Sequence, residues 1–366
     1  MSTALTFDDI LLIPRFSDIG SRDEVSLQTD IGAGIGLNIP IISSNMSTIT
    51  GAPMAYAMNM LGGIGILPRT KDVDTQLLML TTLHGAHHLV LPDATRADSS
   101  TMPVEDAAYV RQCMGRTPVI VSLGPKCDDI KNVVGKFLDY GTTGIALDAA
   151  HGHSEMMVGA IRTIRYWWPN TLIIAGNVAT AEAAEDLWEA GADCVRVGIG
   201  SGSICTTRIV TGFGVPQVTA LNDIGKLRDK TWKNKRIIAD GGIRNSGDIV
   251  KSLALGADAV ILGSLLAGTD ESAGGTEYNG STSITEKNRQ GKSVNYIEGV
   301  EATVSRKGPL SSVIQELVEG IRSGLSYAGA RTIDELRGVE YNRISSASWA
   351  ESQAHIRDIQ ANAQRA

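Results

Sequence analysis

The sequence has few aromatic residues and no long apolar run. Phe, Trp and Tyr together make up 5% of its 366 residues. No apolar stretch approaches the roughly 18 residues that a membrane-spanning helix needs, so we expect no membrane partner. Glycine is abundant instead, with 40 residues, which favours many tight turns between strands and helices over a coiled coil or a β-sandwich.

Cysteine is scarce, and its spacing fits neither a disulfide framework nor a zinc site. The chain contains no C-x-x-C pair, and its cysteines lie far apart, at Cys113, Cys127, Cys194 and Cys205. This spacing is typical of reduced thiols in a cytosolic protein. Residues 1–9 resemble neither a signal peptide nor a transit peptide, so we expect a cytoplasmic protein.

Runs of basic residues are missing as well. Lys and Arg total 33 against 40 for Asp and Glu, which gives a net charge of −7. An acidic balance without basic clusters argues against a nucleic-acid partner. It still permits one small anionic ligand, because backbone N–H groups in a local turn bind anions without basic side chains.

Eight short apolar runs, each bounded by turn residues, alternate with amphipathic stretches. Their β-branched content and short length predict strands at residues 40–44, 63–67, 118–123, 144–148, 172–176, 194–198, 236–240 and 258–263. Helices are predicted over residues 181–190, closed by Gly191, and over residues 245–256, with Asn245 or Ser246 as the N-cap.

Strands that alternate with helices pair in parallel, and eight such units predict an α/β fold, a single-domain (β/α)8 TIM barrel over residues 1–366. The alternative is an open doubly wound sheet, which carries its glycine fingerprint after the first strand. Here the richest glycine turn follows the sixth strand. A helix over residues 311–326 is expected to close the barrel, and the polar tail from Ser345 is expected to be a fraying helix.

Two segments interrupt the alternation. Residues 68–117 form an extended connection between the second and third strands and contain His84, His87 and His88. No cysteine or carboxylate completes a zinc-ligand spacing there, so a solvated helix or loop is expected. Residues 267–299 follow the eighth strand and are polar. Because a long loop in a compact domain is usually a lid or binding element, we predict a mobile active-site flap.

The most informative stretch is residues 195–208, which read Val-Arg-Val-Gly-Ile-Gly-Ser-Gly-Ser-Ile-Cys-Thr-Thr-Arg. Its glycines allow positive φ angles, and successive N–H groups in such a turn form an anion-binding concavity. Cys205 follows directly, where a nucleophile would meet a phosphate-bearing substrate. The alternative is an ordinary turn followed by a buried, inert cysteine.

Two further glycine turns point to the same edge of the barrel. Active sites of TIM barrels lie at the carboxyl ends of the strands, and phosphate is often bound by the loops after strands seven and eight. Those loops contain residues 240–242, Asp-Gly-Gly, and residues 263–264, Gly-Ser. Together with residues 200–203 they predict a phosphate site.

With these motifs, the chain resembles the IMP dehydrogenase and GMP reductase family over nearly its full length. The cysteine loop is the motif most specific to that family. The other matching motifs occur in the family's order, at residues 5–14, 43–46, 148–154, 175–178, 239–244, 266–272, 307–310 and 329–336.

The resemblance implies a barrel that acts on a purine nucleoside 5′-monophosphate with a nicotinamide cofactor. Cys205 matches the nucleophile that bonds carbon 2 of the purine, a role that suits a thiolate. Substrate binding is implied for Ser44, Ser203, Asp240 (the ribose ligand), Gly242, Gly263 and Ser264. Cofactor binding is implied for Asp148 and Asn177, and a K⁺ ion for Gly200, Gly202 and Cys205. The family also implies a homotetramer.

Within the family, the sequence favours the reductase branch, in which NADPH reduces GMP to IMP and ammonia. Thr207 and Glu298 match the pair that protonates the departing ammonia. The dehydrogenase branch hydrolyses its covalent intermediate with an adjacent Arg-Tyr pair in the flap, whereas here Arg289 is followed by Gln290. The flap is also short, and residues 44–46 resemble the reductase form.

The alternative is an IMP dehydrogenase that lacks its regulatory Bateman (CBS) module and converts IMP to XMP with NAD. Ser47 stands where the family usually has an aspartate, Gly280-Ser281 lacks the methionine expected at the flap start, and residues 298–301 resemble the dehydrogenase pattern. More distant alternatives are an FMN-dependent barrel and a catalytically silent nucleotide-binding protein. The presence of Cys205, Thr207 and Glu298 argues against the silent protein.

Overall fold

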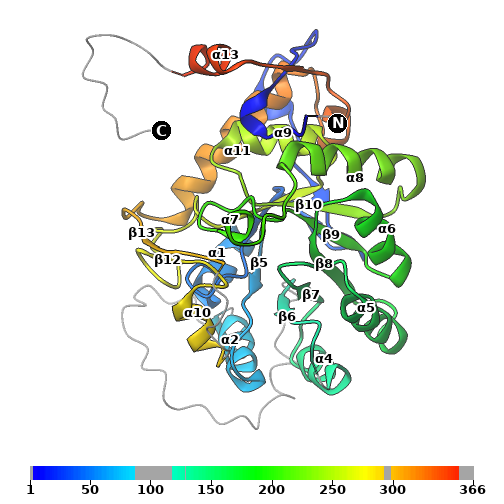
Figure 1. The fold of residues 1–366 in the computed structure, drawn as a ribbon. Coiled ribbons are helices and arrows are strands. Elements are labelled where there is room, and N and C mark those ends of the chain that lie inside the picture. Colours follow the sequence, from blue (N-terminus) through cyan, green and yellow to red (C-terminus); the bar gives the residue numbers. More distant parts are fainter. Residues whose placement is uncertain (1–2, 87–117, 128, 292–297, 354–366) are drawn as a thin grey trace.

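Eight parallel strands close into a barrel at the centre of the molecule (Figure 1). The computed structural model describes residues 3–127, except 87–117, and residues 129–353, except 292–297. Around the barrel the strand order is β10-β11-β4-β5-β6-β7-β8-β9, and β9 bonds to β10 to complete the ring. The strands are β4 (Ile41–Ser43), β5 (Ile64–Leu67), β6 (Ile120–Leu123), β7 (Gly144–Asp148), β8 (Leu172–Val178), β9 (Cys194–Val197), β10 (Arg236–Asp240) and β11 (Ala259–Leu262). Every predicted strand is present, so the TIM barrel is confirmed and the open sheet is wrong.

A helix on the outside of the barrel follows each strand (Figure 1). In chain order these helices are α1 (Ala52–Met60), α2 (Val73–Ala86), α4 (Ile130–Asp139), α5 (Glu155–Trp167), α6 (Ala181–Ala190), α8 (Gln217–Thr231), α9 (Ser246–Ala254) and α11 (Leu310–Tyr327). A short helix, α7 (Thr207–Thr211), precedes α8, and α12 (Ile333–Leu336) and α13 (Ser346–Glu351) follow α11.

The helix ends follow the predicted capping chemistry. The side chain of Asn245 accepts a hydrogen bond from the Asp248 N–H at 2.9 Å, so Asn245 and not Ser246 caps α9. Gly191 ends α6 with a φ of 116°, a left-handed conformation that costs glycine little. Ser345 caps α13, which gives the tail a short helix up to Glu351.

Alternation along the strands separates two apolar layers. One set of side chains fills the barrel interior, at Ile42, Ile64, Ile66, Ile120, Ala146, Leu172, Ile174, Cys194, Ile238, Ala259 and Ile261. Their strand neighbours face outward and pack against the helices, because successive strand residues point to opposite faces. A hairpin of β2 (Thr29–Asp30) and β3 (Gly36–Leu37) adds Ile31 and Leu37 to the interior layer.

The first interrupting segment contains a helix, one of the two structures expected there, whereas the second contains regular structure that its pattern did not predict. In the first, α2 carries His84, which is buried and not solvated as expected; His87 and His88 lie outside the described residues. The second contains β12 (Glu277–Asn279), which pairs with β13 (Glu301–Thr303), and the short helix α10 (Ile284–Arg289). The described residues 267–291 of this segment therefore contain regular structure rather than a plain loop. No cluster of metal-ligating side chains occurs among the described residues.

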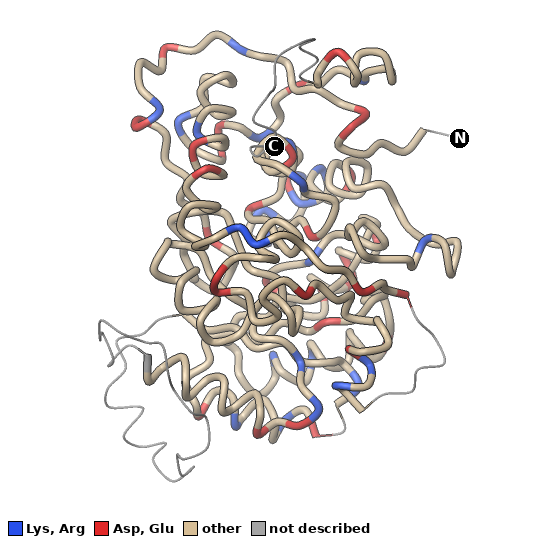
Figure 2. Tube along the Cα trace, turned by 90° about the vertical axis from the view of Figure 1, so that its left-hand side faces the viewer, with Lys and Arg blue, Asp and Glu red and all other residues tan. Residues whose placement is uncertain are grey.

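Acidic and basic residues are interspersed along the described trace (Figure 2). This distribution agrees with the absence of basic runs in the sequence. None of the helices in the described ranges has the length and apolar character needed to span a membrane.

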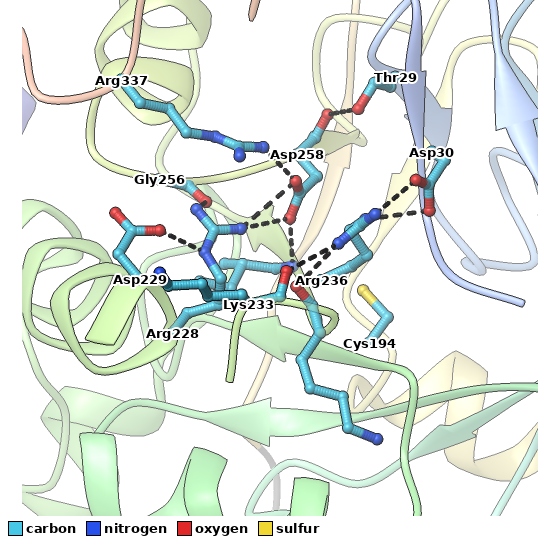
Figure 3. A network of polar contacts seen from close by, with 12 residues as sticks. Thr29, Asp30, Cys194, Arg228, Asp229, Lys233, Arg236, Gly256, Asp258 and Arg337 are labelled. Atoms are coloured by element: carbon cyan, nitrogen blue, oxygen red, sulfur yellow. Dashed lines mark hydrogen bonds and ion pairs between the residues drawn. The ribbon is translucent and has the colours of Figure 1, made fainter. Parts of the chain in front are cut away.

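A buried network of charges lies at the amino-terminal ends of the strands (Figure 3). Asp258, directly before β11, accepts hydrogen bonds from Arg228 at 3.1 Å, from Arg337, and from the Ile237 N–H at 2.7 Å. Beside it, Arg236 at the start of β10 pairs with Asp30 at 2.6 Å. Because Asp258 and Arg228 are almost fully buried, each supplies the counter-charge that the other needs in a low-dielectric interior.

Replacing Asp258 with Ala is expected to lower the free energy of unfolding by about 3–5 kcal/mol, because it removes the buried carboxylate from Arg228 and leaves this arginine with the exposed carboxylate of Asp229. Equilibrium urea unfolding measures the change. Asp18→Ala removes an exposed pair with Arg331 and is the control, with no shift of the midpoint expected. An Asp258→Ala protein that unfolds at the wild-type urea concentration would contradict this account.

Candidate active site

A cavity of about 260 Å³ opens at the carboxyl ends of the strands. All the candidate site residues from the sequence line it, namely Ser44, Asp148, Asn177, Gly200, Gly202, Ser203, Cys205, Thr207, Asp240, Gly242, Gly263, Ser264 and Glu298. They come from the ends of five strands, from the segment between β9 and α7 with the first residue of that helix, and from the flap. The barrel therefore gathers into one site residues that are more than 250 positions apart in the sequence.

The cysteine loop leaves β9 through glycines that no other residue could replace easily. Gly198 has a φ of 151°, and a Cβ there would lie 1.9 Å from the carbonyl oxygen of Asp240. Gly200 follows with a φ of 73°. The turn ends where the Cys205 N–H donates to the Gly202 carbonyl at 3.1 Å. These contacts fold the loop against β10 and hold the thiol at the cavity.

Three side chains form a hydrogen-bonded chain at the thiol. The Cys205 thiol donates to the Thr207 hydroxyl at 3.1 Å, and this hydroxyl donates to Oε2 of Glu298 at 2.7 Å. Backbone bonds align them, because the Thr206 N–H donates to the Glu298 carbonyl at 2.9 Å and the Val300 N–H to the Ile204 carbonyl at 3.0 Å. Such a chain can move a proton between a nucleophile and a carboxylate.

The rim that was predicted to bind phosphate is built as expected from glycine turns, with a tyrosine added. Gly242 has a φ of 80° and lines the cavity together with Gly263 and Ser264. The hydroxyl of Tyr278, on β12, lies 3.2 Å from the Ser203 hydroxyl. Burial raises the pKa of Tyr278, although hydrogen bonds with Ser203 and Ser264 oppose the shift. The phenol therefore stays neutral and can donate to an anion at this rim.

A buried arginine joins the two carboxylates of the site. Arg196 on β9 donates from Nη1 to Asp148 at 3.0 Å and from Nη2 to Asp240 at 2.8 Å. Burial alone would lower the pKa of this guanidinium, but the charges of Asp240 and Asp148 raise it above its ordinary value. Arg69, after β5, also pairs with Asp148 at 3.3 Å. Both carboxylates are therefore paired with a buried guanidinium and fixed in position.

Asn177 offers an acceptor to a ligand. Its Nδ2 donates to Asp240 at 2.7 Å and to the Gly198 carbonyl at 2.8 Å. Its buried Oδ1 has no hydrogen-bond partner within the described chain. A buried acceptor without a partner costs free energy, so a donor group on a bound molecule would satisfy it.

Backbone hydrogen bonds hold Ser44 in the lining of the cavity. Its N–H donates to the Leu262 carbonyl at 3.0 Å, and its carbonyl accepts from the Thr50 hydroxyl at 2.6 Å. Its backbone is therefore used within the fold, and the residue lines the cavity together with Met46.

The sequence interpretation missed Arg196, Arg69 and Tyr278. Arg196 gave a signal, because a charged residue interrupts an otherwise apolar strand, Cys-Val-Arg-Val at residues 194–197. Tyr278 and Arg69 gave none, because each lies in a polar segment where its type is ordinary.

The two thiols of this region are expected to differ in reactivity. Cys205 is partly exposed, whereas Cys194 is fully buried in the barrel interior and its pKa is raised well above the ordinary value, first by burial and then by Asp258 and Asp193. At pH 8, iodoacetamide should alkylate Cys205 at least about tenfold faster, because the thiolate is the reactive form. Peptide mass spectrometry measures both rates, with labelling in urea as the control. Equal rates in the native protein would refute this assignment.

Comparison with known proteins gives a consistent family. A family model described as the IMP dehydrogenase / GMP reductase domain matches residues 4–355. Inosine-5′-monophosphate dehydrogenase of Cryptosporidium parvum is 38% identical over 392 residues, which cover 97% of this chain and 95% of the relative. The enzyme of that name from Borreliella burgdorferi is 37% identical over 397 residues, which cover 96% of each. The one from Nitrosopumilus maritimus is 33% identical over 467 residues, which cover 96% and 98%.

A solved structure matches equally completely. A Cys-to-Ala variant of GMP reductase from Trypanosoma brucei, in complex with guanosine 5′-monophosphate, superposes with a TM-score of 0.83 at 30% identity and covers 97% of this chain and 98% of its own. Because the family model spans nearly the whole sequence and its motifs meet at one cavity, the chain belongs to the IMP dehydrogenase / GMP reductase family, whose members are oxidoreductases of purine metabolism.

Proposed function

We propose that this protein is a GMP reductase, which converts GMP and NADPH to IMP, ammonia and NADP⁺. The observation that carries the proposal is the chain of hydrogen bonds from Cys205 through Thr207 to Glu298. It joins a nucleophile to a carboxylate that can deliver a proton to a leaving amine. The structure of a relative in complex with guanosine 5′-monophosphate supports a purine nucleotide as substrate.

The chain's own residues account for the covalent step. As the Cys205 sulfur bonds to purine carbon 2, its proton passes to the Thr207 hydroxyl, and the hydroxyl proton passes to Glu298. Protonated Glu298 then acts as the general acid for the amine, and the bond between carbon 2 and nitrogen breaks as ammonia leaves. A bound nicotinamide supplies the hydride for carbon 2. The carbon–sulfur bond then breaks and returns the thiolate.

The flap favours reduction over dehydrogenation. A dehydrogenase must activate water to hydrolyse the bond between sulfur and carbon 2. The single arginine of segment 267–299 is Arg289, and it is not among the residues that line the cavity. Its guanidinium instead lies 3.2 Å from the Ser47 hydroxyl and 3.7 Å from Glu277. The described flap therefore brings no arginine to the cysteine.

IMP dehydrogenation with NAD is the second candidate, and the names of the relatives favour it. Three relatives with 33–38% identity are called inosine-5′-monophosphate dehydrogenase. Two of them match over fewer than 400 residues, so a chain of this length does not argue for reduction. Our preference for reduction rests on the position of Arg289, which does not line the cavity.

The cavity suits a nicotinamide on the side of Asp148 and Asn177. The unpartnered Oδ1 of Asn177 is an acceptor, and a carboxamide N–H is a donor of the kind that it lacks. Arg196 and Arg69 hold Asp148 in place beside it. These residues would hold the nicotinamide, which would supply a hydride, in the cavity that Cys205 also lines. We assign NADPH as the cofactor because it accompanies the proposed reduction.

A monovalent cation suits the cysteine loop. Gly200, Gly202 and Cys205 belong to one tight turn that lines the cavity, and backbone carbonyls are the donors that K⁺ takes in proteins. A cation held by this turn would fix the loop that carries the thiol.

Apolar side chains beside the cavity support assembly into a homotetramer. Ile209 on α7 is 86% exposed and Phe213, just after it, is 77% exposed. Figure 1 shows α7 in front of the barrel strands. Neighbouring exposed apolar side chains of this size mark interaction surfaces.

Replacing Phe213 with Asp is expected to lower the mass in solution from that of an oligomer towards one chain of 38.7 kDa, because a carboxylate would be buried at the contact. Light scattering after size exclusion measures the mass. Arg162→Asp, at an exposed polar position on α5, is the control and should not change it. A wild-type protein with the mass of one chain would overturn the assembly proposal.

The reaction is tested by incubating the protein with GMP and NADPH and, separately, with IMP and NAD. We expect the absorbance at 340 nm to fall with GMP and NADPH and to stay constant with IMP and NAD. If the turn holds K⁺, the rate of NADPH oxidation should be at least tenfold higher in KCl than in LiCl. Cys205→Ala is expected to lower either rate at least about 1,000-fold. NADH formation from IMP without any GMP-dependent oxidation would make the protein a dehydrogenase.

A further inference from the structure

The flap rests on the loop that follows β4. Thr48 in this loop receives three flap contacts: its carbonyl accepts from the Ser272 hydroxyl at 2.8 Å and the Gly274 N–H at 2.9 Å, and its hydroxyl accepts from the Asn279 N–H at 3.3 Å. The same loop carries Met46 at the cavity. The position of the flap is therefore fixed relative to the substrate side of the site.

Helix α10 adds a charged contact to this loop. Glu286 is 4% exposed, and its Oε2 accepts a hydrogen bond from the Ser47 hydroxyl. Arg289 closes the group, with Nη1 at 3.2 Å from the Ser47 hydroxyl and at 3.8 Å from Glu286. The carboxylate that accepts from the Ser47 hydroxyl therefore comes from the flap.

We propose that Glu286 is a positioning residue, which docks α10 on Ser47 and thereby holds Glu298 against Thr207. The connection runs through described hydrogen bonds. The Thr285 N–H donates to Glu301 at 2.8 Å, and Glu301 lies on β13, which pairs with β12. The Gly280 N–H donates to the Val300 carbonyl at 3.0 Å, two residues from Glu298.

Moving the carboxylate from Glu286 to position 47 distinguishes a positioning role for this charge from simple packing. Ser47→Asp places a second carboxylate beside buried Glu286, where the Ser47 hydroxyl now forms a hydrogen bond. Two negative charges that close repel strongly when they are shielded from water. Glu286→Gln removes that repulsion and still accepts from a hydroxyl. The double variant with Ser47→Asp and Glu286→Gln again has one carboxylate, now at position 47, and one neutral partner, now at position 286. Arg289 can pair with the new carboxylate.

The experiment measures trypsin cleavage after Lys287 and Arg289 in α10, which reports local opening of the helix. We expect Ser47→Asp to speed cleavage at least about tenfold, Glu286→Gln to change it less than about threefold, and the double variant to return to within about threefold of wild type. Turnover with the active nucleotide should fall in Ser47→Asp and recover in the double variant, in parallel with the cleavage rates. The change should be mainly in kcat, since Glu298 acts on the bound substrate.

Ser47→Asp with wild-type cleavage, or a folded double variant as labile as Ser47→Asp, would overturn the proposal. If Ser47→Asp does not fold, Glu286→Ala removes the same contact without adding charge, and unchanged cleavage in it would overturn the proposal equally. The kinetic part rests on the proposed roles of Thr207 and Glu298, whereas cleavage does not depend on the reaction. Glu298→Gln, which should lose turnover and keep slow cleavage, separates the two failures.

Discussion

The close approach of the cysteine loop to the flap is the constraint on which this site depends. Cys205 and Glu298 come from segments that are far apart in the sequence, and a single hydroxyl, that of Thr207, joins them at 3.1 Å and 2.7 Å. Two backbone hydrogen bonds between residues 204–206 and 298–300 keep these distances. The carboxylate that ends this hydrogen-bonded chain is therefore supplied by the flap.

The residues of the site and the charged network that stabilises the barrel lie at opposite ends of the strands. The reactive groups lie at the carboxyl ends of the strands, where loops can change without disturbing the apolar layers. At the other end, Asp258 holds Arg228, Arg337 and the start of β10 in one buried network (Figure 3). Within the site, Arg196 plays a comparable role, because it neutralises Asp148 and Asp240 and keeps both oriented towards the cavity.

The strands and the location of the site could be predicted from the sequence because both depend on local patterns. A short β-branched run such as residues 236–240 forms a strand, and in a barrel the turn after it must lie at the rim. The contents of the flap could not be predicted in this way. Strand β12 is three residues long and α10 six, and both are stabilised by contacts with Thr48 and Ser47 rather than by their own periodicity. His84 was misjudged for the same reason, since its burial depends on what packs against α2.

The central claim is that the Cys205 thiol bonds to the purine during turnover. The most direct test quenches the protein with acid during the reaction with its nucleotide and examines the peptide that contains Cys205 by mass spectrometry. The account predicts a nucleotide attached to that sulfur, and no attachment at Cys194. Turnover at the full rate while the Cys205 peptide stays unmodified at every time point, or after this thiol has been alkylated, would contradict it.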